Sequence, residues 1–199
     1  MEKQNTKQEI MEAALELFSV QGFEATSTAQ IAQAVGIRKA SLYSHFASKQ
    51  EILDSLTGMI LERYCAHSLL TKDTRADASL DPNSVAQLIC RQLEYILHDP
   101  YVSRARKMLT IEQFRNPELA ELQTKQNYTD VLSFAEDILG RLVERGELKD
   151  CDTQIMAAQF AFPVSVWINL CDREPERENE VMELIKRHIK QFFELYRKD

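Results

Sequence analysis

The segment of residues 26–53 constrains the fold more than any other part of the chain. Ser27 and Gln30 have the spacing of a capping box, which marks the start of a helix. Gly36 follows one helix length later and can supply the positive φ angle that a tight turn requires. The spacing therefore predicts a helix over about residues 28–35 that ends in a turn at Gly36.

A second and a third helix are expected directly after this turn. Leu42 and Phe46 lie one turn apart on the inner face of a helix over about residues 38–46. Ser48 and Glu51 form another capping box and begin the next helix. Short helices joined in this way are typical of the helix-turn-helix, which reads double-stranded DNA.

The rest of the chain is also expected to be helical. Glycine and proline number only five each among 199 residues, and no strand-like alternation persists between turns. Thr6 and Glu9 form a capping box at the start of the first helix, and Gly22 is expected to end it. The other helices are expected over about residues 6–22, 48–70, 82–98, 101–114, 117–146, 153–171 and 176–196. The prediction is an all-α fold of about nine helices.

Charge divides the chain into two parts. Residues 1–50 carry five basic and five acidic side chains, so the net charge of −7 belongs to residues 51–199. A neutral segment with a few placed cations is typical of a sequence-specific regulator and unlike a protein that packages DNA. We expect residues 1–50 to form the helix-turn-helix DNA-binding domain, and residues 51–199 to form a second, acidic helical domain.

Several classes of protein are not expected. The N-terminal residues lack the basic and apolar pattern of a signal peptide, so we expect none, and the most apolar window, residues 160–170, is shorter than the roughly 20 residues of a membrane span. The prediction is a cytoplasmic protein. The four cysteines are widely spaced, so we expect neither disulfides nor a metal site. No cofactor-binding or catalytic motif is present, and we do not expect an enzyme.

Residues 1–53 resemble the DNA-binding domain of the tetracycline-repressor (TetR) family. The matching positions are Phe18, Gly22, Phe23, Thr28, Ile31, Ala32, Ala34, Gly36, Leu42, Tyr43, His45, Phe46, Lys49 and Leu53. The resemblance implies that residues 51–199, the remaining three quarters of the chain, form a helical effector-binding and dimerisation domain. Arg38 replaces the usual serine after the turn, and Lys39-Ala40-Ser41 is also unusual. The operator therefore cannot be taken from a relative.

The recognition helix offers five candidate contacts to DNA bases. Arg38 and Lys39 can reach guanine O6 and N7, and the hydroxyls of Ser41 and Ser44 can bind either base type. Ala40 can touch a thymine methyl group or permit close approach. The alternative is that these side chains only form a solvated surface.

Four further residues are candidates for phosphate contacts. The resemblance implies that Thr28, Tyr43, His45 and Lys49 approach the DNA backbone. Thr28 and Lys49 lie at helix N-termini, where free amide groups attract anions. The alternatives are simple capping for Thr28, partial core packing for Tyr43 and packing for His45.

The C-terminal part offers candidates for an effector pocket and for a dimer interface. Aromatic and methionine side chains that can line an apolar cavity, or be plain core, are Tyr95, Met108, Phe114, Tyr128, Phe134, Phe160 and Trp167. The last two helices carry broad apolar faces that can form a four-helix interface between two subunits. Its candidates are Phe162, Val166, Leu184, Ile185, His188, Ile189 and Phe192.

The sequence predicts a homodimeric, DNA-binding transcriptional regulator. We expect a repressor that binds a palindromic operator. A small apolar or amphipathic effector is expected to release it by favouring a different separation of the two helix-turn-helix domains of the dimer. The alternative is a ligand-independent architectural or protein-recruiting factor.

Overall fold

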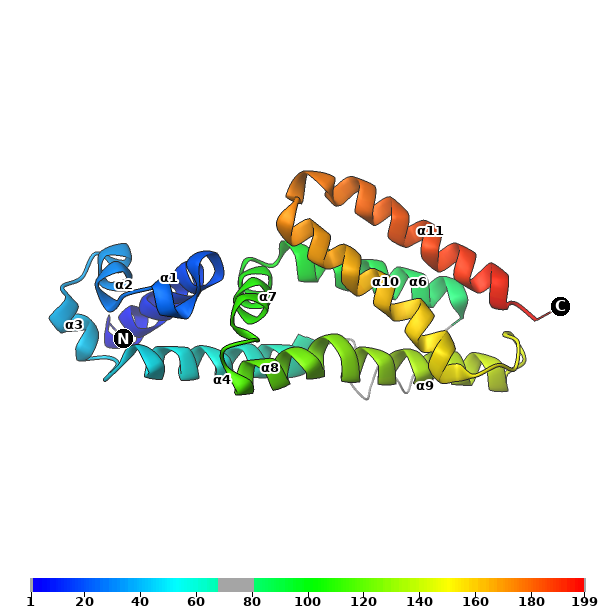
Figure 1. Ribbon diagram of the computed structural model, residues 1–199, viewed down its shortest axis with the longest axis horizontal. Coiled ribbons are helices and arrows are strands. Elements are labelled where there is room, and N and C mark those ends of the chain that lie inside the picture. Colours follow the sequence, from blue (N-terminus) through cyan, green and yellow to red (C-terminus); the bar gives the residue numbers. More distant parts are fainter. Residues whose placement is uncertain (1, 68–80, 199) are drawn as a thin grey trace. The chain divides into compact units, whose positions relative to one another are not determined.

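The computed structural model describes residues 2–67 and 81–198, which fold into two compact units (Figure 1). Unit 1 comprises Met1–His67 and Pro100–Gln123, and unit 2 comprises Ser68–Asp99 and Thr124–Asp199. Within the described ranges the regular elements are all helices, and one isolated bridge joins Leu148 to Arg197. The predicted all-α fold is confirmed.

Unit 1 contains the expected N-terminal helices and two helices from later in the chain. Its elements are α1 (Glu2–Ala25), α2 (Thr28–Val35), α3 (Lys39–Tyr43), α4 (Lys49–His67), α7 (Pro100–Glu112) and most of α8 (Pro117–Thr124). One apolar core joins them, in which Phe18 and Leu42 of the N-terminal helices are buried together with Met108, Leu109 and Leu119. Packing within unit 1 therefore extends beyond residue 50, while the functional division at that residue stays a prediction.

The turn between α2 and α3 forms as the sequence predicts. Ser27 and Gln30 make both hydrogen bonds of the capping box, and Gly36 adopts the left-handed conformation with φ 76°. Helix α3 ends at Tyr43, earlier than expected, because the amide and hydroxyl of Ser44 both donate to Ser41 O at 3.1 and 2.7 Å. These bonds tighten the last turn of the helix.

Helix α1 departs from the expectation at its start. It begins at Glu2, so Thr6 lies inside the helix and does not cap it. The backbone leaves the helical conformation at Gly22, with φ 81° and ψ 168°. The prediction that helical structure breaks at this glycine is confirmed, and a short turn continues to Ala25.

Unit 2 is built from the helices that follow residue 81. They are α6 (Pro82–His98), the π-helical turn η1 (Lys125–Thr129), α9 (Asp130–Glu144), α10 (Thr153–Arg173), the 3₁₀ turn η2 (Pro175–Arg177) and α11 (Glu178–Tyr196). Asp81 and Asp152 cap α6 and α10 with their side chains. The helix expected over residues 117–146 forms as α8, η1 and α9. The final turn expected for residues 68–70 lies outside the described residues.

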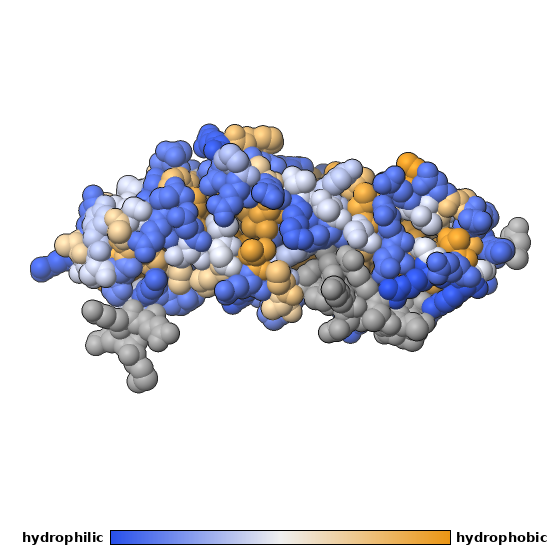
Figure 2. All heavy atoms as spheres, turned by 90° about the horizontal axis from the view of Figure 1, so that it is seen from below, coloured by the Kyte–Doolittle hydropathy of each residue, from blue (hydrophilic) through white to orange (hydrophobic). Residues whose placement is uncertain are grey.

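Helix α10 is the apolar centre of unit 2. Among residues 2–67 and 81–198 it is the one helix that is long and apolar enough to cross a membrane, judged by length and composition alone. The apolar window of residues 160–170 lies within this helix, which forms where the sequence predicts a helix over residues 153–171. Met156, Phe160 and Ala161 of this helix are buried in the core of unit 2. The surface seen in Figure 2 is mainly hydrophilic, with apolar residues interspersed.

Candidate nucleic-acid interface

The recognition helix α3 is anchored by one buried residue and presents the rest of its surface to solvent. The Leu42 side chain is fully buried, whereas Arg38, Lys39, Ala40 and Ser41 are exposed. A leucine held in the core fixes the rotation of the helix, so the opposite side chains point outward. Four of the predicted base-contacting residues therefore form one free surface that can enter a major groove.

Two predicted phosphate contacts are joined to each other beside this surface. The Thr28 hydroxyl lies 3.2 Å from the Tyr43 hydroxyl, and the Tyr43 side chain is 46% exposed. The Lys39 ammonium lies 6.0 Å from the centre of the Tyr43 ring. Hydroxyl groups next to the N-terminus of α2 and a lysine form a surface suited to a phosphate group.

The remaining candidates on this side of unit 1 differ in exposure. Ser44 is exposed, although its hydroxyl already donates to Ser41 O, and His45 is half-buried. The Lys7 ammonium lies 4.8 Å from the centre of the Phe46 ring, which holds α1 against the helix-turn-helix. These positions leave Ser44 free to face DNA and give His45 a partly structural environment.

Lys49 has a structural role that the sequence did not indicate. Its ammonium donates to Phe23 O at 2.7 Å and to Thr26 O at 2.9 Å. It also lies 4.1 Å from the centre of the Phe23 ring, close enough for a cation–π contact. The Lys49 ammonium therefore has partners within its own chain. Its contact with a DNA phosphate stays a prediction.

Glu112 is a buried charge that the sequence analysis missed. Its side chain is 2% exposed, and its Oε1 accepts a hydrogen bond of 2.8 Å from the Phe23 amide. A signal was present in the sequence: Glu112 continues the apolar stripe of Ala105, Met108 and Leu109 at helical spacing. A charged residue in such a stripe indicates a specific partner.

The candidate effector residues come from both units and differ in burial. Met108 is fully buried in the core of unit 1, whereas Phe114 is 89% exposed. A residue at the turn between two helices has few neighbours, which explains why this phenylalanine lies in solvent. Phe134 and Phe160 are buried in the core of unit 2.

The other three candidates reach the surface of unit 2 to different degrees. Tyr95 and Trp167 are half-buried, and Tyr128 is 53% exposed. The Tyr128 ring stacks on Phe162 with centroids 5.3 Å apart. Trp167, with Phe162 and Val166, lines a groove of about 610 Å³ along α10.

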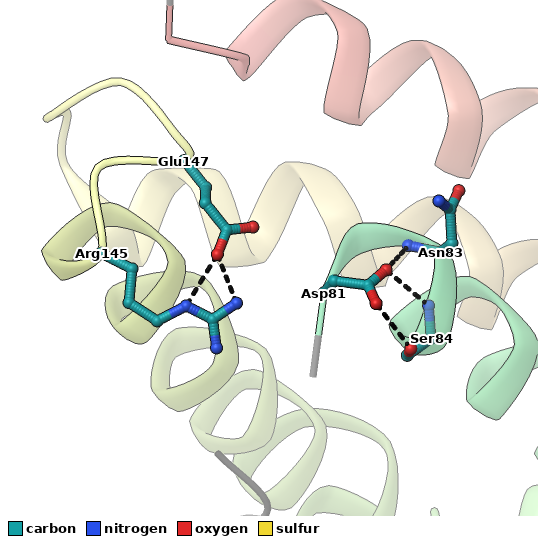
Figure 3. A network of polar contacts seen from close by, with 5 residues as sticks. All are labelled: Asp81, Asn83, Ser84, Arg145 and Glu147. Atoms are coloured by element: carbon teal, nitrogen blue, oxygen red, sulfur yellow. Dashed lines mark hydrogen bonds and ion pairs between the residues drawn. The ribbon is translucent and has the colours of Figure 1, made fainter. Parts of the chain in front are cut away.

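A larger cavity of about 840 Å³ lies elsewhere in unit 2, and none of the candidate effector residues lines it. Its walls come from α6, from the turn after α9 and from α11. Asp81, Asn83 and Glu147 line it, and Figure 3 shows their polar contacts: the Asp81 carboxylate accepts from Asn83 and Ser84, and the Arg145 guanidinium pairs with Glu147. Cys90 faces this cavity, and burial raises the pKa of its thiol.

The candidate dimer residues divide into two groups. Ile185, Ile189 and Phe192 are buried in the core of unit 2, so their side chains do not reach the surface of the chain. Val166 is 62% exposed, and Phe162, Leu184 and His188 are half-buried. The periodic apolar stripe of α11 therefore serves mainly the core of its own chain, whereas α10 exposes the large apolar residues Ile155 and Val166.

The possible metal ligands, which include the cysteines, do not form a metal site in the described part of the chain. In residues 2–67 and 81–198 no three histidine, cysteine, aspartate or glutamate side chains are grouped to hold a metal ion. The four cysteines are free thiols, of which Cys171 is buried.

Two family models together match most of the chain. The model described as bacterial regulatory proteins of the tetR family matches residues 10–56. The model described as the C-terminal domain of AefR-like transcriptional repressors matches residues 85–198, which is more than half of the chain. The first match covers the helix-turn-helix, and the second covers the later helices.

Relatives and solved structures agree with these models. The chain is 27% identical over 180 residues to a probable regulator of transcription, ArpR of Pseudomonas putida, covering 86% of this chain and 84% of ArpR. It is 26% identical over 167 residues to the regulator TtgR of P. putida, covering 81% and 78%. The repressor SmeT of Stenotrophomonas maltophilia has the same fold, with a TM-score of 0.68 and 21% identity over 100% of this chain and 94% of SmeT.

The matched models, the helix-turn-helix with its exposed recognition surface and the helical C-terminal part lead to one assignment. The chain belongs to the TetR family and is a DNA-binding transcriptional regulator.

Proposed function

We propose that the protein is a homodimeric repressor that binds a palindromic operator through α2 and α3 and is released by a small apolar or amphipathic effector. One observation carries the proposal. Leu42 is fully buried and anchors α3, while Arg38, Lys39 and Ser41 are exposed beside the paired hydroxyls of Thr28 and Tyr43.

Sequence readout and positioning come from different residues in this proposal. Arg38 and Lys39 carry the donors that suit guanine O6 and N7, and each good base contact contributes about 1–3 kcal/mol of discrimination. Thr28 and Tyr43 bind the DNA backbone and set the register of the helix. Because residues 1–50 are neutral overall, specific contacts supply a larger share of affinity than general attraction.

Dimerisation is proposed through the exposed face of α10 together with Leu184 and His188 of α11. Ile155 is 52% and Val166 62% exposed, and both line the groove along α10. A helix with core residues on one side and large apolar residues on the other needs a second covering surface. In a dimer with a two-fold axis, the same face of the second chain covers the exposed face of α10. The two helix-turn-helix domains then bind half-sites about 34 Å apart.

Effector control is supported by the likeness in fold to SmeT, which represses a multidrug efflux pump and has been solved in complex with triclosan. An effector of this chain lowers operator affinity only if it binds the two conformations with different affinity. The relatives are regulators of transcription, so we propose a cytoplasmic protein without enzymatic activity, whose DNA-binding function resides in residues 1–50. No observation favours the ligand-independent alternative.

The test begins with selection of operator DNA from a random duplex pool by the full-length protein at fixed salt. The expected product is a palindrome. Lys39→Ala should then change the preferred base at one position of each half-site, and Tyr43→Phe should weaken all sites alike. Lys190→Ala on α11 is the matched control, because it removes one exposed positive charge from unit 2.

Two outcomes contradict the proposal. Footprinting on the protein's own promoter region that shows no protected palindrome at moderate salt would exclude the operator. Equal and sequence-independent losses in the Lys39 and Tyr43 variants would exclude the separate roles. Compounds that release the selected operator from the protein identify the effector class, and failure of a broad apolar panel favours a regulator without a ligand.

A further inference from the structure

The break in α1 leaves a backbone amide that the helix itself does not satisfy. Gly22 has φ 81° and ψ 168°, so the following amide, that of Phe23, does not continue the helical pattern. Glu112 Oε1 accepts from this amide at 2.8 Å, although the two residues lie 89 positions apart in the sequence. The carboxylate is buried, and a hydrogen bond to a charged acceptor is stronger than one between neutral groups.

The carbonyl side of the same residue is held by the opposite charge. Lys49 donates to Phe23 O at 2.7 Å and to Thr26 O at 2.9 Å, and the Thr26 hydroxyl donates to Gly22 O at 2.7 Å. We call Gly22, Phe23, Thr26, Lys49 and Glu112 the α1–α2 joint. Its polar bonds connect the last residue of α7 and the first residue of α4 to the turn between α1 and α2.

The joint lies immediately before the DNA-binding surface. Ser27 caps α2 directly after Thr26, and Thr28 follows with its bond to the Tyr43 hydroxyl of α3. A shift of the backbone at Phe23 therefore changes the direction in which α2 and α3 leave α1. Base contacts require placement within a fraction of an ångström, so a loose joint lowers the fraction of molecules in the binding-competent geometry.

We propose that Glu112 is a positioning residue for operator binding, which acts through the Phe23 amide and touches no DNA. This inference rests on the proposed function and adds a residue outside the helix-turn-helix to its machinery. Neutral backbone carbonyls bind Lys49 on one side of Phe23, and the Glu112 carboxylate fixes the amide on the other.

The decisive variant is Glu112→Met, because methionine keeps the length and fills the apolar surroundings but cannot accept the Phe23 amide. Glu112→Gln keeps an acceptor oxygen and loses the charge. Glu121→Met on the exposed face of α8 is the matched control, since it removes the same charge outside the joint. The affinity of each full-length protein for the selected operator and for a scrambled duplex is measured by fluorescence anisotropy, with active protein counted by titration with excess operator.

The expected result is a rise of about tenfold in the operator Kd of Glu112→Met, equivalent to about 1.4 kcal/mol. Its Kd for scrambled DNA should change less than twofold, because non-specific binding tolerates imprecise placement. Glu112→Gln should recover most of the loss, and Glu121→Met should match the wild type. A purely structural role lowers the active fraction and leaves the ratio of the two Kd values unchanged.

Two other outcomes are distinguishable. If Glu112→Met binds the operator with wild-type affinity per active molecule, the inference is overturned while the proposed function stands. If the wild-type protein selects no operator, the proposed function fails and the inference falls with it. Should Glu112→Met be poorly folded, counting of active molecules at lower temperature still gives the ratio of affinities that decides the question.

Discussion

Replacing Gly22 with alanine should strongly destabilise unit 1. Its φ and ψ of 81° and 168° lie in a region that is essentially restricted to glycine, which costs any other residue about 1–3 kcal/mol. An added Cβ atom would also lie 2.8 Å from Glu112 Oε1 and 3.1 Å from Ile111 Cγ2. Glu112 is buried and bonded to the Phe23 amide, so relief of this contact adds about 1–3 kcal/mol, as overpacking of a core does.

The combined effect of about 2–6 kcal/mol is a large share of the roughly 5–15 kcal/mol by which a domain is stable. Two other glycines give matched controls. Gly36→Ala, with φ 76° and no atom within 4 Å of the added Cβ, should lose only about 1–2 kcal/mol. Gly58→Ala in helix α4, where no atom lies within 4 Å of the added Cβ, should gain about 0.4–1 kcal/mol of stability.

The measurement is chemical denaturation followed by far-ultraviolet circular dichroism, with every variant at the same protomer concentration because dimerisation contributes to stability. The expected order of unfolding free energies runs from Gly22→Ala, the lowest, through Gly36→Ala and the wild type to Gly58→Ala. If Gly22→Ala loses no more than Gly36→Ala, either the backbone at Gly22 or the packing of Glu112 against it is not as described, and the reasoning fails.

Hydrogen bonds from the Ser84 amide and hydroxyl lower the pKa of the Asp81 carboxyl below its ordinary 3.8. The stability that Asp81 contributes as the N-cap of α6 is therefore fully present above pH 3.8, and it is lost as the pH falls through the lower pKa of the folded state. Accordingly, the stability difference between wild type and Asp81→Ala should shrink below pH 3.8, and a difference independent of pH would contradict this. Val166→Asp should dissociate the dimer in sedimentation with unchanged helicity, whereas Phe192→Ala should cost about 3–5 kcal/mol of stability; the reverse pattern would exclude the α10 face. Burial raises the pKa of Tyr101 to about 12, so ultraviolet titration should show one tyrosine that ionises late and that Tyr101→Phe removes.

Local patterns in the sequence predicted the helices well because the signals that define them act between near neighbours. The capping box of Ser27 and Gln30 and the left-handed Gly36 each depend on residues within one turn. The same holds for Asp81 before α6. Residues such as Leu42, placed one turn from Phe46, also revealed which face of α3 is buried.

Assignments that depend on distant partners could not be made from the sequence. The apolar stripe of α11 was visible, but only the packing of unit 2 decided that Ile185, Ile189 and Phe192 serve the core. Phe114 and Met108 looked alike as pocket candidates, yet one is exposed and the other fully buried. The periodicity of a sequence predicts that a helix has an apolar face, but it does not predict which surface covers that face.

By itself the sequence determined an all-helical chain of the TetR family with a helix-turn-helix at residues 26–53. Tertiary structure alone decided how that motif is held. The Lys49 ammonium donates to the carbonyls of Phe23 and Thr26, which lie 26 and 23 positions earlier in the sequence. Glu112 accepts from the Phe23 amide and belongs to another helix. Such bonds form because a break in a helix leaves polar backbone groups that must find partners, and the fold determines which side chains lie close enough to serve.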